Sequence, residues 1–131
     1  MLLSVLLNLI TEKGECIISA AGIKTQSDFL KRIFDYVSKN FNKSITLETV
    51  AAELHLAPAY FSALFSKTSG STFISYLTSF RLNYAKQMLI SSDKTVTEIC
   101  FEAGFGSLSH FLREFKKHFG VTPLSYRKNN A

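Results

Sequence analysis

A dense cluster of basic side chains lies in the stretch GSLSHFLREFKKHFG, residues 106–120. Arg113, Lys116 and Lys117 carry groups that bind phosphate oxygens, and a guanidinium can also bond the edge of a guanine base. The same stretch has apolar residues at helical spacing, so an amphipathic helix whose charged face is merely solvated is the simpler explanation. The rest of the sequence is needed to distinguish a face that is merely solvated from one that binds phosphates or base edges.

Residue types that carry catalysis or bind metals are scattered along the chain. His55, His110 and His118 have no cysteine, histidine or aspartate partners at the spacing of metal ligands, so no metal site is expected. There is no Ser/His/Asp order, no pair of carboxylates typical of an acid–base pocket and no glycine loop for phosphate. We therefore expect neither an enzyme nor a bound cofactor.

The composition favours a small globular protein with an anionic partner. Of 131 residues, 47% are hydrophobic, including twelve phenylalanines, which is enough for a core in one domain or two small ones. The formal net charge is +5, and residues 1–27 contribute none of it. Cys16 and Cys100 lie far apart in apolar surroundings, which predicts free thiols in a reducing cytoplasm, with Cys100 packed in the core.

The chain opens with the apolar run MLLSVLLNLI. This run lacks the basic start of a signal peptide, and about ten apolar residues are too few to span a bilayer, so no membrane association is expected. It predicts either an amphipathic helix whose partner surface is missing from this chain or a terminal helix that packs on the chain itself.

Helical patterns fill the chain from residue 27 to the long helix. Ser27 or Asp28 can cap a first helix, which ends in a turn at residues 40–44. Thr46 caps the short helix LETVAAEL, and Pro58 is well placed to start the next one because its missing N–H has no intrahelical partner there. A glycine at position 70 ends that helix.

A long helix is expected over about residues 72–90, followed by three shorter ones. Thr95 caps VTEICFEA, Gly104 makes a turn, Ser107 caps the basic helix, and Thr122 with the proline after it starts a last turn. The apolar positions of the long helix are Phe73, Leu77, Phe80, Tyr84 and Met88. No strand pattern competes, so the chain is predicted to be all-α with about seven helices.

An internal repeat relates residues 47–70 to residues 96–120. The matched pairs are Val50 and Ile99, Glu53 and Glu102, Leu56 and Phe105, Phe61 and Phe111, Phe65 and Phe115, Lys67 and Lys117, and Gly70 and Gly120. Each copy consists of a short helix, a tight turn and a second helix, which is the helix-turn-helix pattern that presents its second helix to the DNA major groove. Two copies with matching core positions are stronger evidence than a single match.

The spacing of the two copies suits a DNA duplex. The connecting helix of about 19 residues is roughly 29 Å long at 1.5 Å per residue, and one turn of B-DNA is about 34–36 Å. The second helices, about residues 58–68 and 107–119, are therefore expected in successive major grooves. Because the copies are tandem, the DNA site should be asymmetric rather than palindromic.

The run TVTEICFEAGFGSLSHFLREFKKHFGVTPLSYRK resembles the signature of the AraC/XylS family of bacterial transcription regulators. AAELHLAPAYFSALFSKTSG resembles the family's first helix-turn-helix, and SYLTSFRLNYAKQML its linker helix. The resemblance covers about residues 28–128, and the DNA-binding domain that it implies spans residues 27–128. It implies helix-turn-helix units at about 46–70 and 95–120, a linker helix at about 72–90, and double-stranded DNA binding. It also implies a cytoplasmic regulator that usually activates transcription through RNA polymerase.

In many members of this family the module follows a cupin-like sensor domain that ends in dimerisation helices. Residues 1–26 resemble such a tail, so the resemblance implies an excised or truncated regulator. Dimerisation would then depend on the missing N-terminal domain.

By the same resemblance, Leu108, Ser109, Leu112 and Arg113 of the second unit meet base edges. Arg113 is the strongest candidate, because a guanidinium bonds guanine O6 and N7 together, which is worth about 1–3 kcal/mol of discrimination. Leu108 and Leu112 either contact thymine methyl groups or pack in the core. Ser107 can cap its helix while its backbone N–H approaches a phosphate.

Three further basic residues have two interpretations each. Lys116 and Lys117 are either phosphate contacts or charges that only aid solubility. Arg81, the one strong charge in the apolar half of the long helix, is by resemblance either a phosphate ligand or a buried strut paired with a carboxylate such as Glu102. Lys86 is expected on the exposed face of that helix.

The first unit departs from the family pattern. The residues on its outward face are Ala59, Ser62, Ala63, Ser66 and Lys67. Ala63 is the repeat partner of Arg113, a position where family members often have a long polar side chain. A smooth helix of this kind can sit deep in a groove, contact methyl groups and read DNA shape. The alternative is a protein-interaction module that keeps the fold and reads little DNA.

Two positions of the first unit concern local structure. Ala57 stands where the family often has a capping serine, which should cost its helix about 1 kcal/mol. His55 matches Gly104 of the second unit and is expected to adopt a left-handed turn, which histidine tolerates better than most residues.

Overall fold

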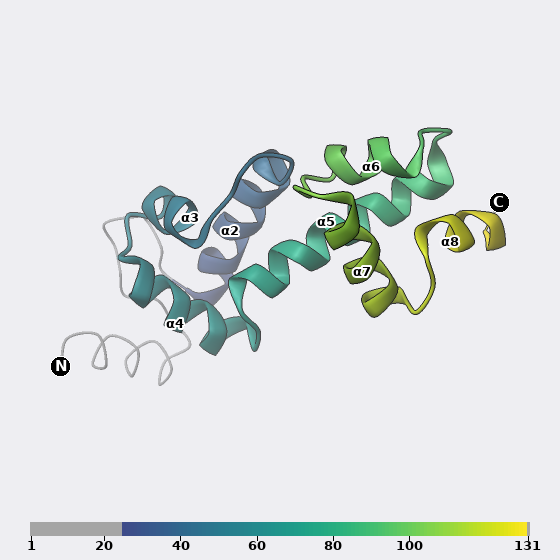
Figure 1. The fold of residues 1–131 in the computed structure, drawn as a ribbon. Helices are drawn as coiled ribbons and strands as arrows, with labels where there is room; N and C mark the ends of the chain where they lie inside the picture. Colours follow the sequence, from purple (N-terminus) through teal and green to yellow (C-terminus); the bar gives the residue numbers. More distant parts are fainter. Residues whose placement is uncertain (1–24, 131) are drawn as a thin grey trace. The chain divides into compact units, whose positions relative to one another are not determined.

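The structure is a computed structural model, and it describes residues 25–130. The predicted helix at MLLSVLLNLI and Cys16 lie outside the described residues. Seven helices and no strands occur between residues 25 and 130, which confirms the all-α fold class (Figure 1). The helices are α2 (Gln26–Asn40), α3 (Leu47–Glu53), α4 (Pro58–Ser69), α5 (Phe73–Ser91), α6 (Val96–Glu102), α7 (Leu108–Phe119) and α8 (Pro123–Asn129).

The described chain divides into two compact units, each with one helix-turn-helix. The first unit contains residues 25–40 and 45–75, and its helix-turn-helix is the pair α3 and α4. The second unit contains residues 41–44 and 76–130, and its pair is α6 and α7. The short segment 41–44 therefore packs with the second unit although it connects two helices of the first.

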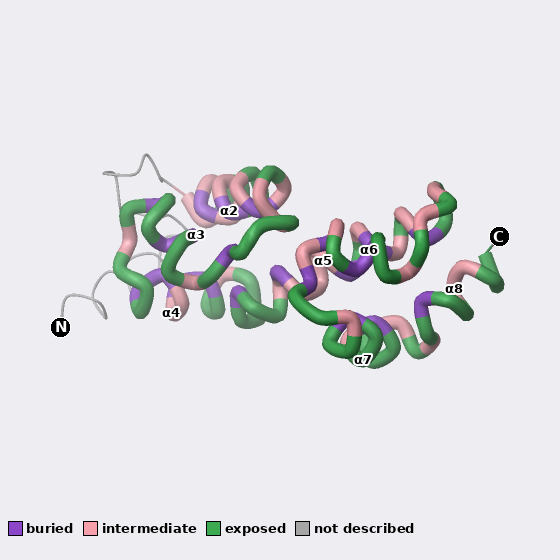
Figure 2. The backbone as a smooth tube through the Cα atoms, turned by 45° about the horizontal axis from the view of Figure 1, so that its top comes forward, coloured by how far each residue is buried: buried purple, intermediate pink, exposed green. Residues whose placement is uncertain are grey.

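Aromatic rings make up much of the core of the first unit. Phe29 of α2 lies 5.8 Å from Phe61 of α4, and Phe61 lies 5.6 Å from Phe73, between ring centroids. Val50 and Ala51 of α3 are also fully buried, and Figure 2 shows buried positions on both α3 and α4. Helix α3 has only seven residues and is too short to be stable alone, so its burial in this core holds it in place.

The core of the second unit is a continuous cluster of buried residues. Its members are Leu82, Ala85 and Leu89 of α5, Ile99, Cys100 and Ala103 around α6, and Phe105, Phe111 and Phe115 at and in α7. Phe111 lies 5.1 Å from Phe105 and 5.7 Å from Phe115, between ring centroids. The expected burial of Cys100 is confirmed, and that burial raises the pKa of its thiol.

Most of the predicted helix ends are confirmed. Thr46 and Thr95 each accept a hydrogen bond from the third backbone N–H of their helix and complete capping boxes with Thr49 and Glu98. The hydroxyl of Ser107 accepts from the N–H of His110 at 3.2 Å.

The first helix-turn-helix shows the two local features expected of it. Ala57 makes no side-chain capping bond, and the helix after it has Pro58 in its first turn. His55 adopts a left-handed conformation with φ 59°, as its match with Gly104 predicts.

The predicted cap of the first helix is wrong. Thr25, and not Ser27 or Asp28, accepts the hydrogen bond, from the N–H of Asp28 at 3.0 Å. Threonine, serine and aspartate are all good caps, and the one chosen is the residue that directly precedes Gln26, the first residue of α2.

The buried face of the long helix includes positions outside the series of apolar residues named from the sequence. Phe73 and Leu77 of that series are buried, and the later buried positions of the helix are Leu82, Ala85 and Leu89. Phe80 and Tyr84 are half-buried, and their ring centroids lie 5.3 and 4.8 Å from that of Phe41. Tyr84 and Met88 also pack against the core of the second unit.

Lys86 is half-buried rather than exposed. Its ammonium lies 5.3 Å from the ring centroid of Phe119 at the end of α7. The lysine therefore covers an aromatic ring of the second unit, a contact that favours a cation over the ring face.

Candidate nucleic-acid interface

The exposed face of α7 carries most of the predicted reading residues. Ser109, Leu112, Arg113, Lys116 and Lys117 are all exposed, as is the capping Ser107. The opposite face of the helix is anchored by Phe111 and Phe115, both fully buried. Because one face is fixed in the core, the other presents these side chains in a defined direction.

The two leucines of this helix differ in their environment. Leu112 is 38% exposed and stands beside Arg113 on the outward face. Leu108 is half-buried and packs against the core of the second unit. Of the two readings open for each leucine, core packing thus describes Leu108, whereas Leu112 remains available for contact with a methyl group.

The guanidinium of Arg113 is held only weakly by the protein. Its side chain is 68% exposed, and its Nε lies 3.8 Å from the carboxylate of Glu114. An exposed ion pair at this distance contributes little. Arg113 can therefore turn its planar donors toward an external acceptor at small cost.

The equivalent face of α4 carries far less charge. Ala59 and Ser66 are exposed, and Ser62 and Ala63 are half-buried. Lys67, which is exposed, supplies the one charge among these five residues. This face offers small side chains and two hydroxyl groups, which suits close approach more than the bonding of base edges.

The two helices predicted to read DNA, α4 and α7, match in length and in the residue that ends them as well as in sequence. Each has twelve residues, and each ends at a left-handed glycine with φ 82°, Gly70 in one and Gly120 in the other. Ala63 and Arg113 are both the sixth residue of their helix. The repeat therefore places the alanine and the arginine at the same position of the same motif.

Arg81 is a strut, but not the one expected. Its Nε donates to the carbonyl of Phe41 at 2.8 Å and its Nη2 to the carbonyl of Lys43 at 2.9 Å. Partial burial lowers the pKa of the Arg81 guanidinium. The expected pairing with Glu102 is wrong, because that carboxylate binds Lys94 at 2.7 Å, and this hydrogen bond raises the pKa of Lys94.

Arg127 has a similar role that the sequence analysis missed. Its Nε donates to the carbonyl of Leu89 at 2.9 Å and its Nη2 to that of Ser92 at 3.1 Å, at the end of α5. A cation at this end of a helix also interacts favourably with the helix dipole.

The internal repeat extends beyond the ranges given above and predicts the start of α8. TFISY at 72–76 matches TPLSY at 122–126, and each threonine caps its helix by accepting from the N–H of a serine, at 3.1 Å in both copies. The repeat thus continues past the glycines into the helix that follows each reading helix.

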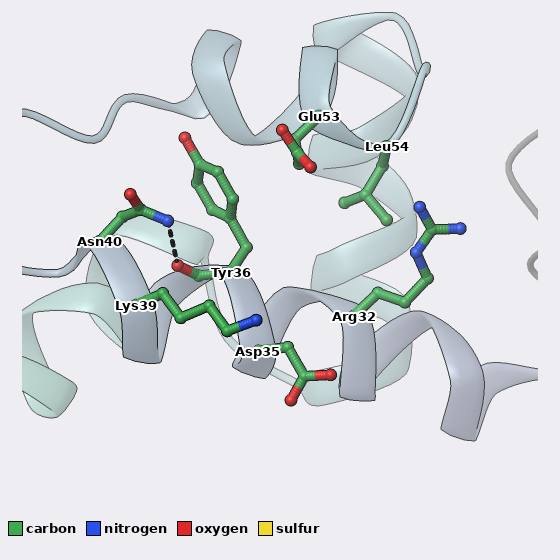
Figure 3. Close-up of a pocket in the computed structure, with 7 residues that line it drawn as sticks. All are labelled: Arg32, Asp35, Tyr36, Lys39, Asn40, Glu53 and Leu54. Carbon is green, nitrogen blue, oxygen red and sulfur yellow. Dashed lines mark hydrogen bonds between the residues drawn. The ribbon is translucent and has the colours of Figure 1, made fainter.

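A hollow of about 400 Å³ lies on the first unit, and none of the predicted reading residues lines it (Figure 3). Its walls come from α2 and from the end of α3, and they combine two basic and two acidic side chains. The lining residues are Arg32, Asp35, Tyr36, Lys39, Asn40, Glu53 and Leu54. The balanced charge gives the hollow no preference for an anion or a cation.

Between residues 25 and 130, no group of three or more histidine, cysteine or carboxylate side chains is placed to hold a metal ion. No helix of that range combines the length and the apolar character needed to cross a bilayer.

Comparison with known proteins gives a family model and many curated relatives. The model, described as a helix-turn-helix domain, matches residues 50–129. The bifunctional transcriptional activator/DNA repair enzyme AdaA of Bacillus subtilis (strain 168) is 32% identical over 102 residues, which are 78% of this chain and 48% of AdaA. The melibiose operon regulatory protein of Escherichia coli (strain K12) is 29% identical over 76% of this chain and 33% of its own length. The chain thus spans half or less of these two relatives.

Solved structures share the fold of the described chain. A transcriptional regulator of Chromobacterium violaceum, named for its AraC-type DNA-binding domain, has a TM-score of 0.73 and 25% identity over 78% of this chain and 91% of its own. The DNA-binding domain of AdpA, solved in complex with a target DNA, has the same TM-score and identity, over 76% of this chain and 90% of its own. Both likenesses cover more than three quarters of this chain.

Proposed function

The chain belongs to the AraC/XylS family of DNA-binding transcription regulators, and on that premise we propose which of its residues read DNA. In this proposal the two units bind one asymmetric site on double-stranded DNA. Helix α7 reads base edges directly, and α4 contributes close contact and shape recognition.

The observation that carries this proposal is the exposed guanidinium of Arg113 on a helix that is anchored in the core by two fully buried phenylalanines, Phe111 and Phe115. A bidentate bond from Arg113 to guanine O6 and N7 supplies about 1–3 kcal/mol of discrimination against other bases. Ser109 and Leu112 lie on the same exposed side of α7. They add a hydroxyl bond and an apolar contact, for example to a thymine methyl group.

Phosphate contacts position the same helix. Lys116 and Lys117 are exposed near its last turn, and Ser107 is exposed at its start. Phosphate contacts fix the register of a protein on the duplex without reading its sequence. We assign one or both lysines, and the backbone N–H of Ser107, to this role.

The first unit reads by a different means. Ala59, Ser62, Ala63 and Ser66 present little bulk, so the helix backbone can approach the groove floor closely. Lys67 sits near the end of α4, where it suits a phosphate contact. Recognition by this unit then depends on methyl groups and groove shape more than on hydrogen bonds.

Several properties of the whole protein form part of the proposal. We assign activation of transcription through contact with RNA polymerase, a cytoplasmic location, and dimerisation through a domain outside this sequence. The name of AdaA includes a repair activity, but the chain covers 48% of that protein. We propose that the region described here has no catalytic function and needs no cofactor.

A second candidate function has one observation in its favour. The outward face of α4 is nearly uncharged, which also suits a module that binds another protein and reads little DNA. The two functions differ in their dependence on salt. Each phosphate contact releases counterions from the DNA. A plot of log K against log salt concentration should therefore have a slope of about −0.9 for each such contact.

The test is a selection of bound duplexes from a random DNA pool, followed by titration of the selected duplex at several salt concentrations. The proposal predicts a non-palindromic consensus and an affinity that falls steeply as salt rises. Binding that is absent, or that is insensitive to salt and to sequence, would favour the protein-interaction module.

A further inference from the structure

Three groups from distant parts of the chain meet at the turn of the second helix-turn-helix. They are the carbonyl of Phe41, the Nε of Arg81 and the Cα of Gly104, which lies between α6 and α7. All three belong to the second unit. The segment of residues 41–44, here called the strap, thus packs directly against this turn.

Contacts from α5 hold the strap in place. Arg81 bonds two of its carbonyls, those of Phe41 and Lys43. The ring of Phe41 packs between Phe80 and Tyr84, at 5.3 and 4.8 Å between centroids. One face of α5 therefore supplies both polar and apolar contacts to a segment of four residues.

The turn itself lies directly against the strap. A Cβ atom added to Gly104 would collide with the carbonyl oxygen of Phe41, and it would lie 2.8 Å from Nε of Arg81 and 3.1 Å from Cα of Asn42. Gly104 also has φ 99°, a conformation that favours glycine. No side chain fits between the turn and the strap, so a displacement of the strap is transmitted to the turn.

We propose that Arg81 is a positioning residue for the reading helix α7, acting through the strap and the turn rather than as a DNA ligand. The inference rests on the proposed DNA function of α7. Ser107, three residues after Gly104, caps α7 and sets the start of the helix. When Arg81 holds the turn in place, it fixes the start of α7. The start of the helix in turn sets the direction in which the side chains of Ser109 and Arg113 point.

The chemistry of the side chain supports this role. The rigid fork of a guanidinium bonds two carbonyls at once, and the single ammonium of lysine cannot reproduce that geometry. A phosphate ligand makes a different demand, because lysine is also a good point charge for phosphate. The pair Arg81→Lys and Arg81→Ala therefore separates the two roles.

The experiment measures affinity for the selected duplex, at several salt concentrations, in wild type, Arg81→Lys, Arg81→Ala and Lys116→Ala. If Arg81 positions α7, both Arg81 variants lose about tenfold in affinity, the scale of one charge-assisted hydrogen bond, with the salt slope unchanged. Lys116→Ala should instead reduce the slope by about 0.9. Full retention of affinity by Arg81→Lys, or a reduced slope in Arg81→Ala, would overturn the proposal.

Amide hydrogen exchange on the DNA-free protein gives a readout that does not depend on DNA binding. The N–H of Gly104 bonds the carbonyl of Phe101 at 3.1 Å, and that of Phe105 bonds the carbonyl of Cys100 at 3.2 Å. These two turn amides should exchange faster in both Arg81 variants and at the wild-type rate in Lys116→Ala. If exchange at the turn does not change, the strap does not support it. If exchange at the turn becomes faster in the Arg81 variants but the wild-type protein binds no duplex, the proposed DNA function is wrong, whereas the support of the turn by Arg81 and the strap is confirmed.

Discussion

Arg113 and Ala63 are the sixth residues of two reading helices of equal length, yet one side chain is 68% exposed and the other ends at a half-buried methyl group. The two helices have the same number of residues, and each ends at a glycine in the left-handed conformation. The two helix-turn-helix motifs thus share the same backbone pattern but carry different side chains on their exposed faces. Direct base recognition is concentrated in the second unit, in our account, because only its helix presents an exposed guanidinium at this position.

The helix caps of the two reading helices should differ in stability. We expect Ala57→Ser to raise the free energy of unfolding by about 1 kcal/mol and Ser107→Ala to lower it by about 1 kcal/mol. Ala57 already has the extended backbone of a cap residue, with φ −66° and ψ 141°, so a serine there needs no rearrangement. Urea unfolding of both variants measures the changes, and a destabilised Ala57→Ser would show that the site cannot use a cap.

Two glycines with positive φ offer a matched pair. Gly120→Ala should cost about 1–2 kcal/mol, the price of a left-handed alanine, because open space surrounds the added Cβ. Gly104→Ala should cost clearly more, because its Cβ meets the strap backbone as well. Denaturant unfolding of the two variants decides this, and equal losses would mean that the strap yields without cost.

Arg127 should stabilise the second unit through the end of α5. We expect Arg127→Ala to lower the free energy of unfolding by about 1.5–3 kcal/mol, since the guanidinium bonds the carbonyls of Leu89 and Ser92. Arg127→Lys should recover only part of this loss, because one ammonium cannot span both carbonyls in the same way. Thermal unfolding of the three proteins checks the order, and a lysine variant equal to wild type would argue for charge alone.

The capping carboxylate of Glu98 should make part of the stability depend on pH. The backbone N–H of Thr95 bonds Glu98 at 2.9 Å and lowers the pKa of its carboxyl below the ordinary 4.5. A carboxyl whose pKa is lower in the folded state stabilises the fold above the unfolded pKa, and this contribution is lost as pH falls through the folded value. The difference in unfolding free energy between wild type and Glu98→Gln should therefore shrink below about pH 4.5. Urea titrations at neutral pH and near pH 3.5 measure it, and a constant difference would exclude the carboxylate as its source.

Much of the fold could be predicted from the sequence because its signals are local. The caps at Thr46, Thr95 and Ser107, the left-handed turn at His55 and the uncapped Ala57 each depend on a few neighbouring residues. The first helix shows the limit of this reasoning. Thr25, Ser27 and Asp28 are all capping types within four residues, and only the folded backbone distinguishes them.

The arginine contacts could not be predicted in the same way. Arg81 and Arg127 bond backbone carbonyls, which every residue has, so the sequence of the partner carries no signal. One of the two roles that the resemblance implied for Arg81 was a pairing with Glu102, but that carboxylate pairs with Lys94. Helical spacing marked Phe80 and Tyr84 as apolar positions, but it could not show that their rings contact Phe41 in the strap. The residues on the reading faces were predictable as surface positions, and their DNA contacts remain predictions.

The most direct test of the account is site selection with Arg113→Ala beside Lys116→Ala. The account predicts that Arg113→Ala relaxes the preference at one base pair, normally a guanine, and weakens the selected duplex by about 1–3 kcal/mol. Lys116→Ala should weaken all duplexes about equally and leave the consensus unchanged. If Arg113→Ala keeps the full consensus and merely weakens every duplex alike, the assignment of base reading to Arg113 is wrong.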